Sequence, residues 1–191
     1  MGSVSHPPFV DVAMMQKVEE RIIRPTIQGL QQQSIDYRGI IFFGLISVDD
    51  DPFVIEYNCR MGDPETQSVF PRLKTDLVEL CRATAKGEVA NVEVELDERA
   101  VASVILVSGG YPGSYEKGKV ITGLDQVEGS LVFHAGTKFG ADGALLTNGG
   151  RVLAITSYAD TFQKAVAQSL TNAEKVQFEG AYFRRDIGFD L

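Results

Sequence analysis

The chain has 191 residues, 44% of them apolar and 23% charged, and its 18 basic and 26 acidic side chains give a formal net charge of −8. This length suits one large domain or two small ones with a proper hydrophobic core. The acidic balance argues against non-specific binding to nucleic acid, which requires neutralisation of phosphates, and no apolar run is long enough to cross a bilayer.

The first predicted element is a helix that begins after Asp11, a residue type preferred at helix N-caps. Apolar residues then recur at helical spacing and predict one buried face, formed by Val12, Met15, Val18, Ile22 and Ile23. Pro25 is expected to kink or interrupt this helix, because proline lacks the backbone N–H group that the helix needs. Ile27 and Leu30 indicate that the helix then resumes.

A β-hairpin is predicted over residues 39–57. An apolar run leads into an acidic turn at residues 49–52, and a second β-type run follows the turn. The second strand ends with Glu56 and Asn58, which are two residues apart. Residues at that spacing lie on the same face of a strand, with Cα atoms roughly 6.6 Å apart.

Two helices are predicted after the hairpin. The chain breaks at Gly62, and the first helix is expected to begin at Asp63 as N-cap with Pro64 next to it. The second covers about residues 75–86 and ends at Gly87, a typical C-terminal stop. Its expected inward-facing residues are Leu77, Leu80 and Cys81.

Short β-type runs dominate the chain after residue 97, namely 102–107, 119–121, 131–135, 144–147 and 152–157. The dipeptides Gly109-Gly110 and Asp142-Gly143 predict turns, and Asn148-Gly149 predicts a tight hairpin. One amphipathic helix is expected near residues 161–175. We therefore predict an α+β protein with a boundary near residues 88–98, which divides it into domains 1–93 and 94–191.

The chemistry of the chain is concentrated at the end of the predicted hairpin. A carboxylate and an amide oxygen on one strand face can converge on one hard cation, because such ions take oxygen donors. Arg60 would continue the same strand face and place a guanidinium beside the metal, where it can bind phosphate oxygens in a two-pronged manner. Glu56, Asn58 and Arg60 thus predict a site for phosphoryl transfer.

Residues 56–67, Glu-Tyr-Asn-Cys-Arg-Met-Gly-Asp-Pro-Glu-Thr-Gln, resemble the signature of the glycinamide ribonucleotide synthetases (phosphoribosylamine–glycine ligases), a family of ATP-grasp enzymes of purine biosynthesis. Further segments resemble the family in the same order along the whole chain, at residues 1–5, 24–27, 37–40, 110–113, 134–138, 147–153 and 184–188. The resemblance implies the C-terminal part of an ATP-grasp catalytic domain, followed by a small, mainly antiparallel β domain with one helix.

The resemblance also implies a reaction and its participants. Glycine would be joined to 5-phosphoribosylamine at the expense of ATP, through a glycyl-phosphate intermediate, with Mg²⁺ or Mn²⁺ held by Glu56 and Asn58 and with Arg60 as the catalytic residue. The implied substrate-binding residues are Ser5, Asp63, Pro64, Glu65 and Lys138. The implied protein is a cytoplasmic monomer that binds small molecules and neither nucleic acid nor a membrane.

The family carries nucleotide-binding subdomains that have no counterpart in these residues, so we expect the chain alone to be inactive as a ligase. Two alternatives remain open: a different ATP-grasp carboxylate–amine ligase, or a non-catalytic structural or interaction fragment. The Gly113–Val120 segment satisfies the spacing of a P-loop, but it ends in Val and reads as strand and turn, so we reject it as a nucleotide site.

Other candidates have plain structural explanations. Cys59 and Cys81 lack metal-binding spacing and indicate reduced thiols, and strand alternation predicts that Cys59 packs inward. His134 is expected to be a hydrogen-bonded structural residue. Lys138 and Arg151 could approach a substrate phosphate, although the sequence gives only weak support for this.

Overall fold

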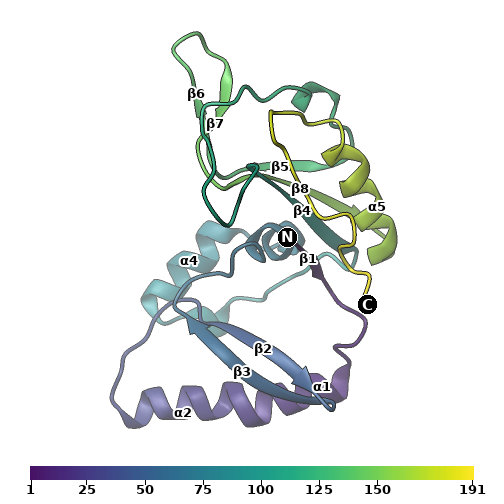
Figure 1. The fold of residues 1–191 in the computed structure, drawn as a ribbon. Coiled ribbons are helices and arrows are strands. Elements are labelled where there is room, and N and C mark those ends of the chain that lie inside the picture. Colours follow the sequence, from purple (N-terminus) through teal and green to yellow (C-terminus); the bar gives the residue numbers. More distant parts are fainter. The chain divides into compact units, whose positions relative to one another are not determined.

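The structure, a computed structural model, describes all residues from Met1 to Leu191 and contains two compact units (Figure 1). The sheet unit comprises Met1–His6, Asp63–Arg72 and Glu98–Leu191. The hairpin unit comprises Pro7–Gly62 and Leu73–Asp97. Two short segments that precede residue 93 therefore pack with the C-terminal part of the chain. The division into domains 1–93 and 94–191 stays a prediction for the protein as a whole.

A four-stranded antiparallel sheet forms the centre of the sheet unit, with the order β1 (Gly2–Ser5), β4 (Ala100–Val107), β8 (Arg151–Ala159) and β5 (Leu131–His134). Every residue of β4 is buried, which explains its unbroken apolar sequence. The edge strand β1 was not predicted, because it has four residues and no alternation of apolar and polar side chains.

Helix α5 (Phe162–Ala173) covers one face of this sheet and lies along β4 and β8 (Figure 1). Its N-cap is Thr161, whose side chain accepts a hydrogen bond from the Lys164 N–H, so the predicted start of this helix is confirmed. The apolar core beneath it combines strand, helix and C-terminal residues: Val104, Leu106, Val152, Leu153, Ile155, Ala173, Val176 and Phe178. This core gives the sheet unit its own hydrophobic centre.

Two of the predicted β features in this unit are wrong. Residues 119–121 form no regular strand and pair only through an isolated bridge from Val120 to Leu146. Asn148-Gly149 does not connect a hairpin either, because β7 (Leu145–Thr147) pairs with β6 (Thr137–Phe139) whereas β8 belongs to the four-stranded sheet. The hairpin turn lies instead at Asp142-Gly143, as predicted for that dipeptide, and Gly143 has a φ of 81°.

The remaining elements of the sheet unit are short. Helix α3 spans only Thr66–Val69 and continues into a 3₁₀ turn at Phe70–Arg72, with another such turn at Leu124–Gln126. The predicted N-cap at Asp63 is wrong: the N-cap is Glu65, whose side chain makes no capping hydrogen bond.

The hairpin unit begins with one long helical segment. It consists of α1 (Val12–Val18), a π-helical stretch at Glu19–Ile23 and α2 (Arg24–Gln32). Asp11 caps α1 as predicted, through a 2.8 Å hydrogen bond from the Met14 N–H to its carboxylate. Pro25 occupies the first turn of α2, directly after the π-helical stretch, and the helical segment continues across it.

The buried stripe of this segment differs from the predicted one. Val18 and Ile22 are buried as expected, and Met14 joins them. Val12 and Met15, in contrast, are 86% and 47% exposed, so their predicted burial is wrong. A two-stranded hairpin offers too little surface to cover a wide helix face.

The predicted hairpin is confirmed as β2 (Phe42–Val48) and β3 (Asp51–Asn58), joined by a two-residue turn. Asp49 and Asp50 both have positive φ, at 51° and 60°, as the tight turns of β-hairpins require. Helix α4 (Leu77–Lys86) follows, capped by Asp76 and ended by Gly87 in the left-handed conformation, and a 3₁₀ turn spans Val89–Asn91. Leu77 and Cys81 are exposed, so the prediction that they face inward is wrong.

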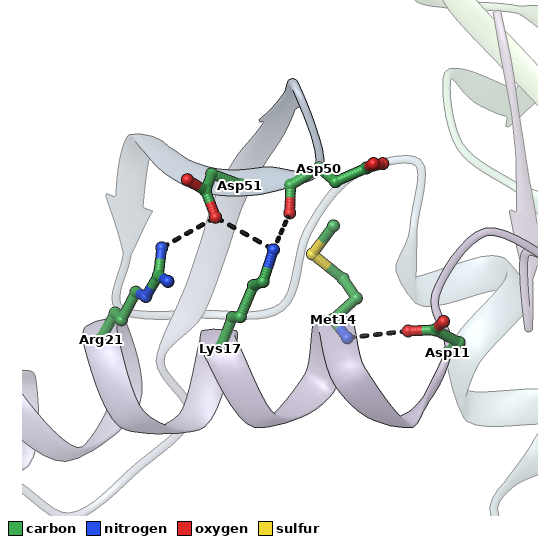
Figure 2. Close-up of polar contacts among 6 residues, drawn as sticks. All are labelled: Asp11, Met14, Lys17, Arg21, Asp50 and Asp51. Atoms are coloured by element: carbon green, nitrogen blue, oxygen red, sulfur yellow. Dashed lines mark hydrogen bonds and ion pairs between the residues drawn. The ribbon is translucent and has the colours of Figure 1, made fainter.

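An ionic cluster ties helix α1 to the hairpin turn (Figure 2). The Asp51 carboxylate lies 3.0 Å from Lys17 Nζ and 2.8 Å from a guanidinium nitrogen of Arg21. Lys17 also donates to the backbone oxygen of Asp50 at 2.6 Å. Hydrogen bonds from Lys17 and Arg21 hold the pKa of Asp51 below its ordinary value of 3.8.

Replacement of Asp51 by asparagine is expected to lower the free energy of unfolding at pH 7, because the negative charge between Lys17 and Arg21 is lost. A carboxyl group whose pKa is lower in the folded state contributes stability above its unfolded pKa, and this contribution disappears as the pH falls through the folded value. The difference between the two proteins should therefore shrink below pH 3.8. Urea denaturation at several pH values measures this difference in the free energy of unfolding, and Asp49→Asn in the same turn is the control. A loss of unfolding free energy in Asp51→Asn that is equally large at pH 7 and at pH ~3 would contradict the ionic explanation.

No helix of the structure combines the length and the apolar character that a membrane crossing requires.

Candidate functional site

Glu56 and Asn58 lie side by side at the end of β3. The Asn58 side-chain nitrogen donates a hydrogen bond of 2.9 Å to Glu56 Oε1, so the two side chains lie on the same face of the strand. Glu56 is exposed and Asn58 is partly buried. The two side chains can therefore turn their oxygens toward a ligand on that face of β3.

A β-bulge lies directly before this pair. Gly44 is opposite Glu56 and Leu45 is opposite Val54, so Ile55 is the extra residue on β3. Such bulges bend the strand and change the direction of the side chains that follow. Gly44 adds a second local feature, since a Cβ atom at this position would lie 2.8 Å from Glu56 Cγ. A glycine opposite Glu56 thus leaves the space in which that side chain lies.

The chemistry of this pair fits a hard divalent cation. A carboxylate and an amide oxygen are donors that Mg²⁺ accepts, and magnesium sites commonly use only one or two carboxylates together with waters and substrate phosphates. No group of three or more His, Cys, Asp or Glu side chains in the structure could hold a metal ion. An ion at Glu56 and Asn58 would therefore need further oxygen donors from water and from a bound phosphate.

Arg60 does not continue the strand face. β3 ends at Asn58, and Arg60 lies in the bend that follows, where its Nη1 donates to the backbone oxygen of Met61 at 2.9 Å. The sequence-based expectation of a third residue on the same face is wrong because the strand ends too early. The guanidinium is exposed, and its position depends on the bend rather than on strand geometry.

Cys59 is exposed, so its predicted inward packing is also wrong, and the end of β3 is again the reason. Its thiol lies near Tyr37: loss of solvent and a hydrogen bond with Cys59 raise the pKa of the Tyr37 hydroxyl. The same hydroxyl donates to the backbone oxygen of Ile40 at 2.7 Å. These contacts attach the bend after β3 to the segment that precedes β2.

The Asp63–Glu65 turn belongs to the sheet unit, and contacts from two strands hold it. The Asp63 carboxylate forms a 2.8 Å ion pair with Arg151, the first residue of β8. The backbone oxygen of Pro64 accepts a 3.2 Å hydrogen bond from the Ser3 hydroxyl on β1. Glu65 is partly buried, and its backbone oxygen accepts from the N–H groups of two residues of α3. The turn is therefore fixed by its neighbours rather than by helix capping.

The other predicted substrate-binding residues, Ser5 and Lys138, lie outside the Asp63–Glu65 turn, on two strands of the sheet unit. Ser5 on β1 accepts a 3.1 Å hydrogen bond from Arg72. Lys138 is exposed on β6, in a hairpin that projects beyond the four-stranded sheet (Figure 1). His134 is exposed and shares a 3.0 Å hydrogen bond with the Thr137 hydroxyl. The P-loop-like segment leads into isolated β-bridges at Val120 and Thr122 rather than into an α-helix, which agrees with its rejection as a nucleotide site.

Sequence reasoning missed one residue beside the candidate side chains in each unit, namely Gly44 in the hairpin unit and Arg151 in the sheet unit. Gly44 could have been found from the hairpin register, because the residue opposite a functional side chain limits the space around it. The role of Arg151 in holding Asp63 could not be found in this way, since the two residues are 88 positions apart in the sequence.

Comparison with known proteins identifies the class to which this arrangement belongs. Residues 1–66 match the family model described as "Phosphoribosylglycinamide synthetase, ATP-grasp (A) domain", and residues 101–190 match "Phosphoribosylglycinamide synthetase, C domain". The expected α+β class, with the C-terminal part of an ATP-grasp catalytic domain, is thereby confirmed. The chain belongs to the phosphoribosylglycinamide synthetase family.

Relatives and solved structures agree with this assignment. The chain is 41% identical to the phosphoribosylamine–glycine ligase of Caldanaerobacter subterraneus subsp. tengcongensis, over 98% of this chain and 45% of the relative. It is 47% identical to the enzyme of that name from Halalkalibacterium halodurans, over 98% of this chain and 44% of the relative. The crystal structure of the Thermotoga maritima phosphoribosylamine–glycine ligase matches with a TM-score of 0.80 and 35% identity, over 97% of this chain and 46% of that one.

More distant structures share the fold alone. The Kluyveromyces lactis urea carboxylase matches with a TM-score of 0.66 at 15% identity, over 97% of this chain and 16% of that one. The chain spans about 45% of the length of the curated relatives that it matches. It carries the Glu56–Asn58 pair within the part that matches the ATP-grasp model.

Proposed function

We propose that the chain supplies the metal-binding strand and the C-terminal part of an ATP-dependent ligase. The reaction joins the carboxylate of glycine to the amine of 5-phosphoribosylamine and gives glycinamide ribonucleotide, ADP and phosphate. The observation that carries this proposal is the contact between Glu56 and Asn58 at the end of β3, within residues 1–66 that match an ATP-grasp domain. The name shared by the relatives supports the choice of substrates.

Glu56 and Asn58 would hold Mg²⁺ or Mn²⁺ through a carboxylate and an amide oxygen. The bound ion would partly neutralise the negative charge on the nucleotide phosphates. The Asn58 amide nitrogen donates to Glu56 Oε1 and so holds the two side chains together on one strand face, while Gly44 leaves the space in which the Glu56 side chain lies. The protein's part in phosphoryl transfer is then mostly positioning and electrostatics.

Arg60 is the proposed catalytic residue. Its exposed guanidinium keeps donors beyond the one bonded to Met61, and these can bind the oxygens of a phosphoryl group in transfer. The glycine carboxylate oxygen attacks the γ-phosphorus of ATP, and ADP leaves. The ribosyl amine then attacks the carbonyl carbon, the amine loses a proton and phosphate leaves. No protein nucleophile takes part in either step.

The substrate-binding residues proposed for this ligase are Ser5, Asp63, Pro64, Glu65 and Lys138. Glu65 has no side-chain role in capping α3, so its carboxylate is available for the amine of a substrate. Lys138 offers an exposed ammonium group for a phosphate. We also propose that the whole protein is a cytoplasmic monomer without nucleic-acid or membrane partners.

The proposed function is tested by grafting residues 1–191 into the Thermotoga maritima ligase in place of the matching 46% of that chain. We expect ADP release that requires both glycine and phosphoribosylamine, and no release above background from the 191-residue chain alone. ADP release that occurs with other carboxylates and amines, but not with this pair, would favour a different ATP-grasp ligase. A graft that is folded and binds ATP but releases no ADP with any pair would favour the non-catalytic alternative.

A further inference from the structure

Three glycine-containing segments of the sheet unit meet at the start of β8. Gly136 and Gly149 are in direct backbone contact, and the Asn148 N–H donates to the Gly136 oxygen at 2.7 Å. The Ser108 hydroxyl donates to the Gly149 oxygen at 2.8 Å, and the Ser108 N–H donates to the Gly150 oxygen at the same distance. These contacts place the chain before β8 in one defined position.

Arg151 is the residue that this packing positions. Its backbone oxygen accepts a 2.9 Å hydrogen bond from the Gly136 N–H, and it pairs with Val107 across the sheet. Its side chain is 32% exposed and extends to Asp63. One guanidinium nitrogen lies 2.8 Å from the Asp63 carboxylate, and the other donates to the Asp63 backbone oxygen at 3.1 Å. The guanidinium thus holds both the side chain and the backbone of a single residue.

We propose that Arg151 is a positioning residue that fixes the Asp63–Glu65 turn in its working geometry. This inference rests on the proposed function, in which the turn contributes to substrate binding. A single ion pair at a half-exposed site adds little to stability. Two attachment points on one residue, however, restrict both the direction of the Asp63 side chain and the orientation of the peptide group that leads into Pro64.

This assignment replaces the earlier expectation that Arg151 could approach a substrate phosphate. Asp63 occupies the edge of the guanidinium between its two terminal nitrogens, so a phosphate cannot bind along that edge. The Asp63 carboxylate also neutralises the charge that would attract an anion. The contact instead links the C-terminal part of the chain to the signature turn, which follows the metal-binding strand along the sequence.

Hydrogen exchange in the 191-residue chain tests the positioning directly. The N–H groups of Ser68 and Val69 donate to the Glu65 oxygen at 2.9 and 3.0 Å, so their exchange reports whether the turn is held. We expect Arg151→Met and Asp63→Asn to speed exchange at both amides at least about tenfold. The control Arg185→Met removes the pair with Glu174 in the same unit and should leave exchange at these amides unchanged. Unchanged exchange in Arg151→Met, or an equal increase in the control, would overturn the proposal.

Kinetics in the Thermotoga graft distinguish positioning from a general structural role. Misplacement of the turn should lower kcat about 100-fold while the KM for ATP stays within about twofold, because nucleotide binding does not depend on the turn. A kcat per folded molecule equal to that of the parent graft would overturn the proposal. The two experiments also separate the hypotheses: faster exchange in a graft without ligase activity would refute the proposed function and leave the positioning by Arg151 intact.

Discussion

Replacement of Glu56 by glutamine is expected to lower glycine-dependent ADP formation by at least about 100-fold in a full-length graft. Glutamine keeps the shape of the side chain and can still contact Asn58, as Glu56 does in the structure. It removes the only formal negative charge of the pair, and a hard cation bound through two protein oxygens depends strongly on that charge. The assay measures initial rates of ADP release at saturating ATP and metal.

The control for this experiment is Glu93→Gln. Glu93 is exposed in the same unit and the substitution makes the same change in net charge, so it should leave the rate unchanged. Binding of Mn²⁺–ADP gives a readout that does not depend on turnover: paramagnetic broadening of the Asn58 amide should be lost in Glu56→Gln and retained in Glu93→Gln. Full activity and full broadening in Glu56→Gln would show that the Glu56 carboxylate is not needed to hold the metal.

Local signals in the sequence predicted the parts of the fold that local contacts build. The predicted cap at Asp11 and the predicted start of α5 near Thr161 are confirmed, because each of these side chains accepts a hydrogen bond from an N–H group three residues further along the chain. Gly87 ends α4 because a left-handed residue is needed there. The shared face of Glu56 and Asn58 follows from strand periodicity alone, so the central pair of the site could be predicted before its surroundings were known.

Local sequence signals did not predict the features that depend on contacts between segments far apart in the chain. Asp63 has the residue type and the following proline of a helix start, yet its carboxylate is used by Arg151. Asn148-Gly149 is a strong turn signal, but a dipeptide cannot specify whether the two flanking strands pair with each other. β1 forms only because β4 offers an edge nearly 100 residues later, with Gly2 opposite Val104. Each of these features depends on a partner that local pattern does not reveal.

The end of β3 shows how a small local difference changes the predicted site. Strand periodicity would place Arg60 and Asn58 on one face, but the strand stops at Asn58 and the next residues bend. The bend exposes Cys59 and leaves Arg60 bonded to its own neighbour. Glu56 and Asn58 thus lie on one strand face as predicted, whereas the position of Arg60 depends on the bend after β3.

Substitution of Gly136 by alanine is expected to destabilise the sheet unit by about 1–3 kcal/mol. A Cβ atom at this position would lie 2.5 Å from the Gly149 Cα and 2.6 Å from the Arg151 oxygen. Both neighbours are backbone atoms, so no side-chain rotation can relieve the contact. The start of β8 must move, and the hydrogen bond between the Gly136 N–H and the Arg151 oxygen must lengthen or break.

Gly29→Ala is the matched control for Gly136→Ala. Gly29 lies inside α2, and a Cβ atom there would meet nothing within 4 Å. Alanine should therefore stabilise the hairpin unit by about 0.5–1 kcal/mol, because glycine loses more backbone freedom in a helix. Hydrogen exchange at the fully buried Ile155 in β8 measures the stability of the sheet unit in both variants. Equal exchange at Ile155 in both would contradict the predicted backbone clash.

The same substitution connects the packing of the glycine segments to the signature turn. If the position of Arg151 depends on the contact between Gly136 and Gly149, a shift of β8 must also move the guanidinium away from Asp63. The hydrogen-exchange rate of the Ser68 amide should then increase in Gly136→Ala by more than the loss of global stability explains. Adding Arg151→Met to Gly136→Ala should raise that rate little further. Fully additive effects would mean that the glycine contact stabilises the sheet but does not hold the turn.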